Sequence, residues 1–277
     1  MTQTRPTPYL LLAVTLVAFA GNSVLTRAAL VDPMNAGASF AAVRLVSGAG
    51  MLVLLAVFSR SQVVPRRSDV PSVLALFAYA LCFSLAYRAI SAATGALILF
   101  ALVQITMIGV AQMRGHRLSM MGGLGMLLAF VGLSWLLLPG LSAPPLGAAL
   151  LMAAAGVSWG LYSLWGQGGG DPSGRTLRNF VGTTPLALAL LLFLPIELTS
   201  AGWALAIASG AITSALGYML WYRLLPSISV PLAASAQLSV PLITAVGGVL
   251  FLGEGLSLRL LGASVLILGG IFLTGRK

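Results

Sequence analysis

Ten stretches of mostly apolar residues follow one another along the chain, and each is long enough to cross a lipid bilayer as a helix. They cover 9–31, 36–58, 70–87, 91–113, 118–139, 144–166, 177–196, 201–222, 229–252 and 256–274. A spanning helix needs about 20 such residues. The segments between the runs are short and carry turn-forming or charged residues, so no separate soluble domain is expected. Because the runs are continuous rather than alternating, we expect helices and not a β-barrel.

The composition agrees with an integral membrane protein embedded in the lipid bilayer. Hydrophobic residues make up 59% of the chain and charged residues only 7%, whereas a soluble domain carries about 25% charged residues. The net charge of +10 does not indicate a nucleic-acid partner, because the basic residues are scattered singly or in pairs between apolar runs. No residue pattern typical of a cofactor or metal site is present, and we expect neither.

The basic residues also predict which way the helices run. With ten spans and a cytoplasmic N-terminus, eleven basic residues fall on the cytoplasmic side and only Arg88 and Arg259 on the other. The eleven are Arg5, Arg60, Arg66, Arg67, Arg114, Arg117, Arg175, Arg178, Arg223, Arg276 and Lys277. Such a bias is typical of cytoplasmic loops. We therefore expect a multi-pass protein of the bacterial inner membrane with both termini in the cytoplasm.

The sequence repeats itself at about half its length. The segment Ile90–Ser119 resembles Ser227–Ser257, with Thr106 and Gly109 matching Thr244 and Gly247. This predicts two repeats, 1–140 and 141–277, of five helices each. Because five is odd, the two repeats must enter the membrane from opposite sides. Inverted repeats are typical of transporters, which bind their substrate near the midplane between the halves.

Short motifs in both halves resemble a known family. They are Ala18-Phe19-Ala20-Gly21-Asn22-Ser23, Arg44-Leu45, Tyr87-Arg88-Ala89-Ile90-Ser91-Ala92, Gly156-Val157-Ser158-Trp159-Gly160-Leu161-Tyr162, Tyr222-Arg223 leading to Pro226, and Pro241 with Leu252-Gly253-Glu254. Together with the repeat, they make the chain similar to the drug/metabolite transporter superfamily, specifically its ten-helix EamA-type members. The chain departs from the family pattern at Phe19, where tryptophan is usual, at Gln104, often proline, and at His116, often glutamate.

The resemblance implies a secondary transporter, in most members an exporter, of small metabolites, amino acids or drugs. It also implies that the first four helices of each half enclose the substrate path. The fifth and tenth helices would pack outside it or at a dimer contact, so the protein is expected to be a monomer or a homodimer.

Polar and aromatic side chains at mid-span are the candidate substrate-binding residues. They are Asn22, Arg44, Tyr79, Gln104, Ser158, Trp159, Tyr162 and Gln237, with Pro241 beside them. Polar groups in hydrocarbon cost free energy and therefore face the bundle interior, a cavity or each other. For the serines and threonines the alternative is hydrogen bonding between helices, worth about 0.6 kcal/mol each. Gln104 and Gln237 occupy corresponding helices of the two halves, and each amide has several hydrogen bonds to satisfy.

Two prolines and Arg44 each allow two interpretations. Pro231 and Pro241 would each break a helical hydrogen bond, which either kinks the helix for packing or shapes a cavity. Arg44, about two turns inside its helix, either anchors the helix or binds an anionic group such as a substrate carboxylate. Tyr79 and Trp159 are the central aromatic residues. Amides and aromatic rings suit amphipathic or aromatic solutes better than inorganic ions.

The acidic residues argue against a proton relay inside the membrane. Asp32, Asp69, Asp171 and Glu197 fall between the apolar runs, and Glu254 falls at the end of the ninth, where we expect it to pair with Arg259. Facilitated diffusion or exchange is therefore simpler than proton coupling through a central carboxylate.

The sequence thus predicts an alternating-access transporter that exports a small organic solute. A channel or a facilitative importer is the alternative. A membrane-embedded enzyme needs a catalytic constellation, and we identify no catalytic residue. Glycines on the fourth, fifth, ninth and tenth helices predict close packing there. The identity of the solute stays open.

Overall fold

A computed structural model describes residues 8–59, 64, 66–114, 119–138, 143–166, 171–224 and 236–274. Over these ranges the chain is helical and contains no strand. The helices are α1 (Pro8–Leu30), α2 (Gly37–Ser59), η1 (Arg67–Asp69), α3 (Val70–Tyr87), α4 (Ala92–Met113), α5 (Met120–Leu137), α6 (Leu146–Gly166), α7 (Pro172–Phe193), α8 (Ser200–Ala208), η2 (Ser209–Leu216), α9 (Gly217–Leu224), α11 (Ser239–Leu252) and α12 (Leu258–Thr274).

Eight helices in the described part of the chain are long and apolar enough to cross a membrane, with α8, η2 and α9 counted as one continuous helix. The last two predicted runs correspond to shorter apolar helices, α11 with 14 residues and α12 with 17. The prediction of an all-helical, multi-pass membrane protein is confirmed. The count of ten spans stays a prediction, because part of the ninth run lies outside the described residues.

Side chains at the first residues of the helices fix where several of them begin. The hydroxyls of Ser91, Ser119 and Thr199 each accept a hydrogen bond from a backbone N–H in the first turn that follows, which satisfies a donor that the helix itself cannot. The carboxylate of Asp171 likewise accepts hydrogen bonds at the start of α7. Its Oδ1 lies 3.1 Å from the backbone nitrogen of Ser173, and its Oδ2 lies 3.0 Å from that of Gly174. The predicted start of this helix at 177 is therefore wrong.

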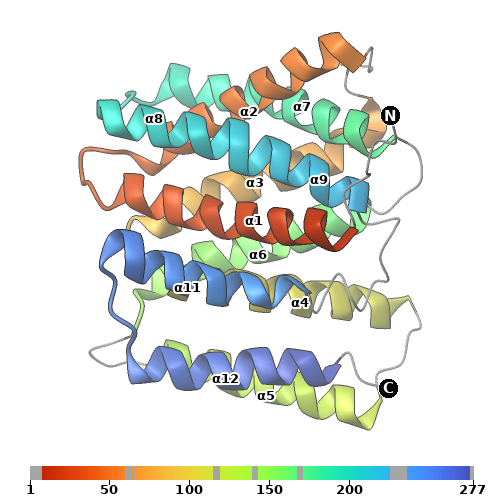
Figure 1. Cartoon of the computed structure of the whole chain (residues 1–277), viewed down its shortest axis with the longest axis vertical. Coiled ribbons are helices and arrows are strands. Elements are labelled where there is room, and N and C mark those ends of the chain that lie inside the picture. Colours follow the sequence, from red (N-terminus) through yellow and green to blue (C-terminus); the bar gives the residue numbers. More distant parts are fainter. Residues whose placement is uncertain are drawn as a thin grey trace.

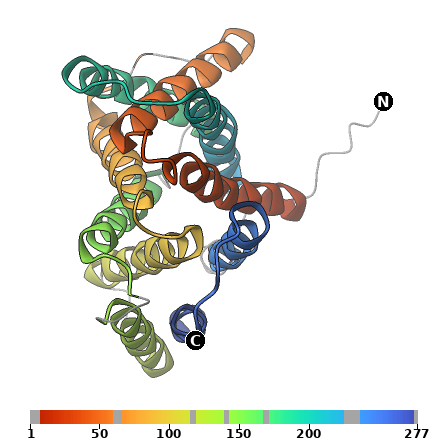
Figure 2. The same ribbon diagram turned by 90° about the vertical axis from the view of Figure 1, so that its left-hand side faces the viewer.

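The helices lie side by side in one bundle, and α1 begins at the same end at which α12 finishes (Figure 1). Both views place α5 and α12 together at one edge (Figures 1 and 2), where α5 packs along the length of α12. The remaining long helices pack around α1, α3 and α6. This arrangement agrees with the position outside the path that the resemblance implies for the fifth and tenth helices.

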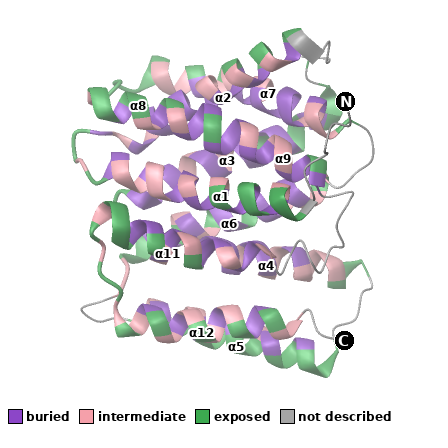
Figure 3. Cartoon of the chain, in the orientation of Figure 1, coloured by how far each residue is buried: buried purple, intermediate pink, exposed green. Residues whose placement is uncertain are grey.

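The distribution of buried and exposed residues agrees with this arrangement of the helices. The buried residues form the interior of the bundle, and exposed residues occur along the outward sides of the helices (Figure 3). Many exposed residues are large and apolar, among them Leu127 at 60%, Leu250 at 71% and Val265 at 73% exposure. A soluble protein does not expose apolar surface on this scale, whereas lipid covers it at no cost.

Glycines explain the tight contact between α5 and α12. A Cβ atom on Gly125 would collide with the carbonyl oxygen of Gly270, and one on Gly270 would meet the carbonyl oxygen of Gly125 at 2.5 Å. The two backbones therefore touch, as small residues allow between membrane helices. At Gly109 and Gly269 an added Cβ meets no atom within 4 Å, so close packing is confirmed only at particular glycines.

Pro241 does not interrupt a long helix as predicted. Gln237 ends a helical segment, Leu238 forms a turn, and α11 begins anew at Ser239. Pro241 thus lies in the first turn of α11, where a helix needs no backbone N–H and tolerates proline. The predicted kink in mid-helix is replaced by a break in the helix just before the proline. Pro231 lies outside the described residues.

We predict that Gly125→Ala lowers the stability of the protein in detergent by about 1–3 kcal/mol, because the added methyl group overpacks the contact. The matched control is Gly269→Ala on α12, where the methyl group meets nothing and alanine favours the helix. Thermal unfolding of the purified variants checks this. Equal melting temperatures for Gly125→Ala and Gly269→Ala would contradict the packing described here.

Candidate functional site

A buried asparagine on α1 connects the polar groups at the centre of the bundle. Asn22 is 2% exposed. Its Oδ1 accepts hydrogen bonds from the hydroxyls of Ser209 at 2.6 Å, Thr213 at 3.3 Å and Ser214 at 3.3 Å. Its Nδ2 donates to the hydroxyls of Tyr79 at 3.1 Å and Tyr218 at 3.4 Å.

The three hydroxyls that reach Asn22 owe their common direction to the wide helix η2. This segment is a π-helix, in which hydrogen bonds run from residue i to i+5. Residues 209, 213 and 214 consequently face the same side. Such segments are rare and occur frequently at functional sites. Thr213 and Ser214 are polar residues within an apolar run, but no residue pattern there indicates the wider turn.

Arg44 on α2 lies against this network and is 1% exposed. Its Nε donates to Ser214 at 2.9 Å, and its Nη2 donates to the hydroxyls of Tyr218 at 2.7 Å and Tyr79 at 3.2 Å. The guanidinium carbon is also 5.2 Å from the ring centre of Tyr79 and 5.0 Å from that of Phe83, within the range of cation–π attraction. Arg44 thus points into the bundle rather than toward the membrane surface.

A glycine on η2 permits this contact. A Cβ atom on Gly210 would collide with the carbonyl oxygen of Arg44 and with the hydroxyl of Ser47. The backbones of η2 and α2 therefore approach closely at the residue that carries the guanidinium, which places Ser214 within reach of it.

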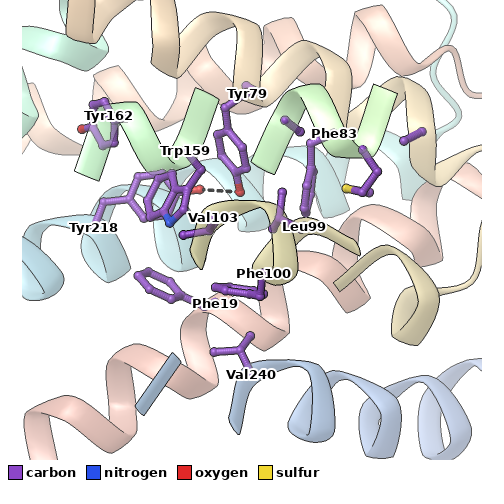
Figure 4. Close-up of a cluster of buried hydrophobic side chains, with 14 of the residues drawn as sticks. Phe19, Tyr79, Phe83, Leu99, Phe100, Val103, Trp159, Tyr162, Tyr218 and Val240 are labelled. Carbon is purple, nitrogen blue, oxygen red and sulfur yellow. Dashed lines mark hydrogen bonds between the residues drawn. The ribbon is translucent and has the colours of Figure 1, made fainter. Parts of the chain in front are cut away.

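Aromatic rings form the other half of the site (Figure 4). Trp159 of α6 is 2% exposed and lies 4.5 Å from Tyr218, 4.9 Å from Tyr79 and 5.6 Å from Phe19 between ring centres. These separations are typical of favourable ring pairs. The two tyrosine hydroxyls are 3.0 Å apart and join the aromatic cluster to the polar network.

Between these groups lies a cavity of only about 10 Å³. Its lining residues are Phe19, Asn22, Ser23, Tyr79, Phe83, Leu99, Phe100, Trp159 and Tyr218. A single water molecule needs about 10–15 Å³. The centre is therefore closed to any organic solute in this conformation.

One ion pair lies at the C-terminal end of α1. Arg27 Nε lies 3.0 Å from Glu254 Oε1, and Arg27 Nη1 donates to the carbonyl oxygen of Tyr87 at 2.8 Å. Glu254 Oε2 accepts from the backbone N–H of Ala92 at 2.8 Å. The pair thus joins the ends of α1, α3, α4 and α11. The prediction that Glu254 pairs with Arg259 is wrong.

The backbone conformation after α11 explains why Glu254 pairs with Arg27. Gly253 takes a left-handed conformation with φ of 64°, and the N–H of Glu254 bonds the carbonyl oxygen of Gly248 at 3.1 Å. This helix-ending turn suits glycine and directs Glu254 back toward Arg27. Arg259 instead donates to the carbonyl oxygen of Leu138.

A second ion pair lies at the other end of α3. Asp69 Oδ2 is 2.8 Å from Arg178 Nε on α7 and also accepts from the N–H of Arg66 at 2.9 Å. Both partners of the pair are buried, Asp69 at 6% and Arg178 at 8% exposure. Because α7 begins at Pro172, Arg178 lies well inside the helix rather than in its first turn, as the predicted start at 177 would place it.

The nine candidate residues fall into two groups. Asn22, Arg44, Tyr79 and Trp159 meet at the centre, and Tyr162 touches its edge, 5.4 Å from Trp159. The other four do not line the central cavity formed by the described residues. Gln104 and Gln237 are buried, Ser158 is half-buried on α6, and Pro241 lines an apolar groove of about 410 Å³ with Ala93 and Leu97.

Sequence reasoning missed Tyr218 and Ser209 as members of the site. Tyr218 is not among the candidate residues of the sequence analysis, and Ser209 has no distinguishing feature in the sequence. The available signal for Tyr218 was its spacing of four residues from Ser214, which places the two on the same face of a helix.

We predict that Asn22→Ala destabilises the protein by about 1–3 kcal/mol or more, because it leaves buried hydroxyls without their acceptor. Ser158→Ala, at a half-buried position on α6, is the control and should leave the melting temperature unchanged. Thermal unfolding in one detergent compares the two. If both variants melt like the wild type, the network does not hold the helices together.

Comparisons with known proteins agree with the fold and the motifs. The profile of the EamA-like transporter family matches residues 146–276. An uncharacterized protein of Pseudomonas aeruginosa is 48% identical over 266 residues, which cover 95% of this chain and 93% of that protein. A solved crystal structure shares the fold with a TM-score of 0.65 at 19% identity, over 95% of this chain and 97% of the other. The chain therefore belongs to the EamA-like transporter family.

Proposed function

We propose that the protein is a secondary transporter that moves a small organic solute across the inner membrane by alternating access. The observation that carries this proposal is the buried polar and aromatic centre around Asn22, Arg44 and Trp159. Polar groups at this depth are expensive in a membrane helix and mark substrate pathways. Family membership supports transport rather than catalysis, and we assign no catalytic role to the chain.

The packing of the helices supports two inverted halves, 1–140 and 141–277. We pair α1 with α6, α2 with α7, α3 with α8–α9, α4 with α11, and α5 with α12. When the two halves are exchanged, these contacts between helices have counterparts. The contact of α3 with α6 corresponds to that of α9 with α1, and the contact of α4 with α6 corresponds to that of α11 with α1. The pairs α2–α7, α4–α11 and α5–α12 are in contact and map onto themselves. Such pseudo-symmetry suits a site that faces each side in turn.

In this proposal, each of the two ion pairs holds one end of the bundle closed, so that the two ends can open alternately. Arg27–Glu254 joins four helix ends on one side of the central cavity, and Asp69–Arg178 joins α3 to α7 on the other. We infer that the conformation is occluded, with both ends closed. Opening either end requires only its own ion pair to separate, since no residue belongs to both.

The remaining predictions are part of the same proposal. The charge distribution supports cytoplasmic termini, and the family resemblance supports export. Gln104, Ser158, Tyr162, Gln237 and Pro241 are proposed to line the path when one end opens. A channel or a facilitative importer is the second candidate, but the closed centre of about 10 Å³ favours a carrier over an open pore.

We predict saturable and stereoselective flux in proteoliposomes, because solutes must fit a closed centre before they cross. Collapse of the pH gradient alone should leave the rate unchanged, since all five carboxylates lie at or beyond helix ends. Radiolabelled D- and L-forms of a transported solute make the comparison. Flux that rises linearly with concentration and ignores stereochemistry would indicate a channel. Loss of flux with the pH gradient would contradict uncoupled transport.

We predict that neutralising one ion pair opens one end only. Ser23 lines the central cavity and is 1% exposed, so Ser23→Cys in a Cys82→Ala background reports access. Asp69→Asn should admit a membrane-impermeant thiol reagent from the cytoplasmic side, and Glu254→Gln from the opposite side. The unmodified pairs in the same background are the control. Labelling from one side in both variants would contradict separate gates.

A further inference from the structure

Arg44 is a buried cation without a counter-charge. The chain has five acidic residues, all of them in the described ranges. Two of them form the ion pairs Asp69–Arg178 and Glu254–Arg27. Asp32 and Glu197 lie between helices and Asp171 precedes α7. Within the described structure Arg44 makes no ion pair, and its guanidinium bonds only hydroxyl groups.

The groups around Arg44 are short of hydrogen-bond acceptors. The two lone pairs of Asn22 Oδ1 are both occupied by the hydroxyls of Ser209 and Ser214, and the hydroxyl of Thr213 lies closer to the backbone oxygen of Ser209 at 3.0 Å. The hydroxyl oxygen of Tyr79 lies within hydrogen-bond distance of three donors, from Asn22, Arg44 and Tyr218. Donors therefore compete for few acceptor sites.

Several buried donors have no acceptor among the described residues, and two of them belong to the groups that meet at this centre. These two are Nη1 of Arg44 and Nε1 of Trp159. A buried donor without a partner costs about 1–3 kcal/mol, and more where the group is charged. The shortage thus affects both the polar and the aromatic sides of the site. A ligand that supplied acceptor atoms and negative charge would relieve it.

We propose that the transported solute carries a carboxylate that binds Arg44 and an apolar or aromatic body that packs against Trp159 and Phe19. This inference rests on the proposed function and names its substrate class. An ionised carboxylate is acceptor-only, with about four lone-pair sites, and it matches the planar donor fork of arginine. The carboxylate would take over from the tyrosine hydroxyls that hold Arg44 in the occluded centre.

The same charge excludes other solutes. A cationic drug or a metal ion placed at this centre would meet Arg44 with no nearby carboxylate to offset the repulsion, which is strong in a medium of low dielectric constant. A neutral solute could use the aromatic rings but would leave the guanidinium without its counter-charge.

Matched pairs of probes test the proposal. Phenylacetate and phenylacetamide, and indole-3-acetate and indole-3-acetamide, differ at the carboxylate and share the aromatic body. Phenyl phosphate tests a different anion. We expect the carboxylates to raise the melting temperature of the purified protein and to bind at least about tenfold more tightly than the amides, as charged hydrogen bonds imply.

Substitutions of arginines test whether Arg44 causes the preference for carboxylates over amides. Arg44→Gln should abolish the preference for carboxylate over amide, and Arg44→Lys, which keeps the charge but loses the fork, should retain part of it. Arg88→Gln, at an exposed arginine between α3 and α4, is the matched control and should keep the full preference. Amides that bind as well as the acids, no response to either carboxylate, a response to phenyl phosphate only, or an unchanged preference in Arg44→Gln would each overturn the proposal.

Flux measurements separate this inference from the proposed function. Carboxylates that bind through Arg44 but never cross the membrane of proteoliposomes would refute transport and leave the binding assignment standing. Saturable flux of neutral solutes that is unaffected by Arg44→Gln would support transport and refute the substrate class.

Discussion

The hydrogen bonds that hold Arg44 inside an apolar bundle are the interaction on which the rest of the structure depends. An arginine at the centre of a spanning helix costs about 2.5–3.5 kcal/mol on insertion scales, and here it cannot reach the membrane surface because it is 1% exposed. Its position is stable only because Tyr79, Tyr218 and Ser214 accept its hydrogen bonds. Those residues come from α3, α9 and η2, so the cation fixes the relative positions of elements from both halves of the sequence. Asn22 adds α1 to the same network.

The architecture around this centre separates what must stay fixed from what must move. The contact between α5 and α12 lies at the edge of the bundle and is backbone against backbone at Gly125 and Gly270, which suits a rigid support. The helices around the centre are tied at their ends by one ion pair on each side. An ion pair is held by a few directional contacts, so it can separate as a unit while the apolar surfaces beside it slide. The proposed transport cycle needs no further moving part.

Sequence reasoning predicted the helical membrane fold, the family and several of the residues that meet at the buried centre. The apolar runs are reliable because lipid leaves the backbone little choice, and Asn22, Arg44, Tyr79 and Trp159 stood out because polar and aromatic residues at mid-span need partners. Three features depended on geometry that the sequence does not display. The π-helix at Ser209–Leu216 aligns three hydroxyls that normal helical spacing would spread apart.

The other two misses concern helix ends. Asp171 caps α7 ahead of the predicted run, so Arg178 lies well inside the helix, where it reaches Asp69. The turn at Gly253 directs Glu254 to Arg27 rather than to the nearby Arg259. In each case a local capping interaction decides a contact with a residue far away in the sequence. Gln104 and Gln237, which the repeat made prominent, are buried but do not line the closed cavity, and their proposed role belongs to an open conformation.

Distances between spin labels at the two ends of the bundle test the central claim most directly, that the ends open alternately around a closed centre. One pair of labels replaces Arg88 and Gly255, near the Arg27–Glu254 ion pair, and the other replaces Ser68 and Ser173, near Asp69–Arg178, both in a Cys82→Ala background. Alternating access predicts that conditions which lengthen one distance leave the other short, with no population in which both are long. Long distances at both ends in the same molecules, or fixed distances under every condition that supports flux, would contradict it.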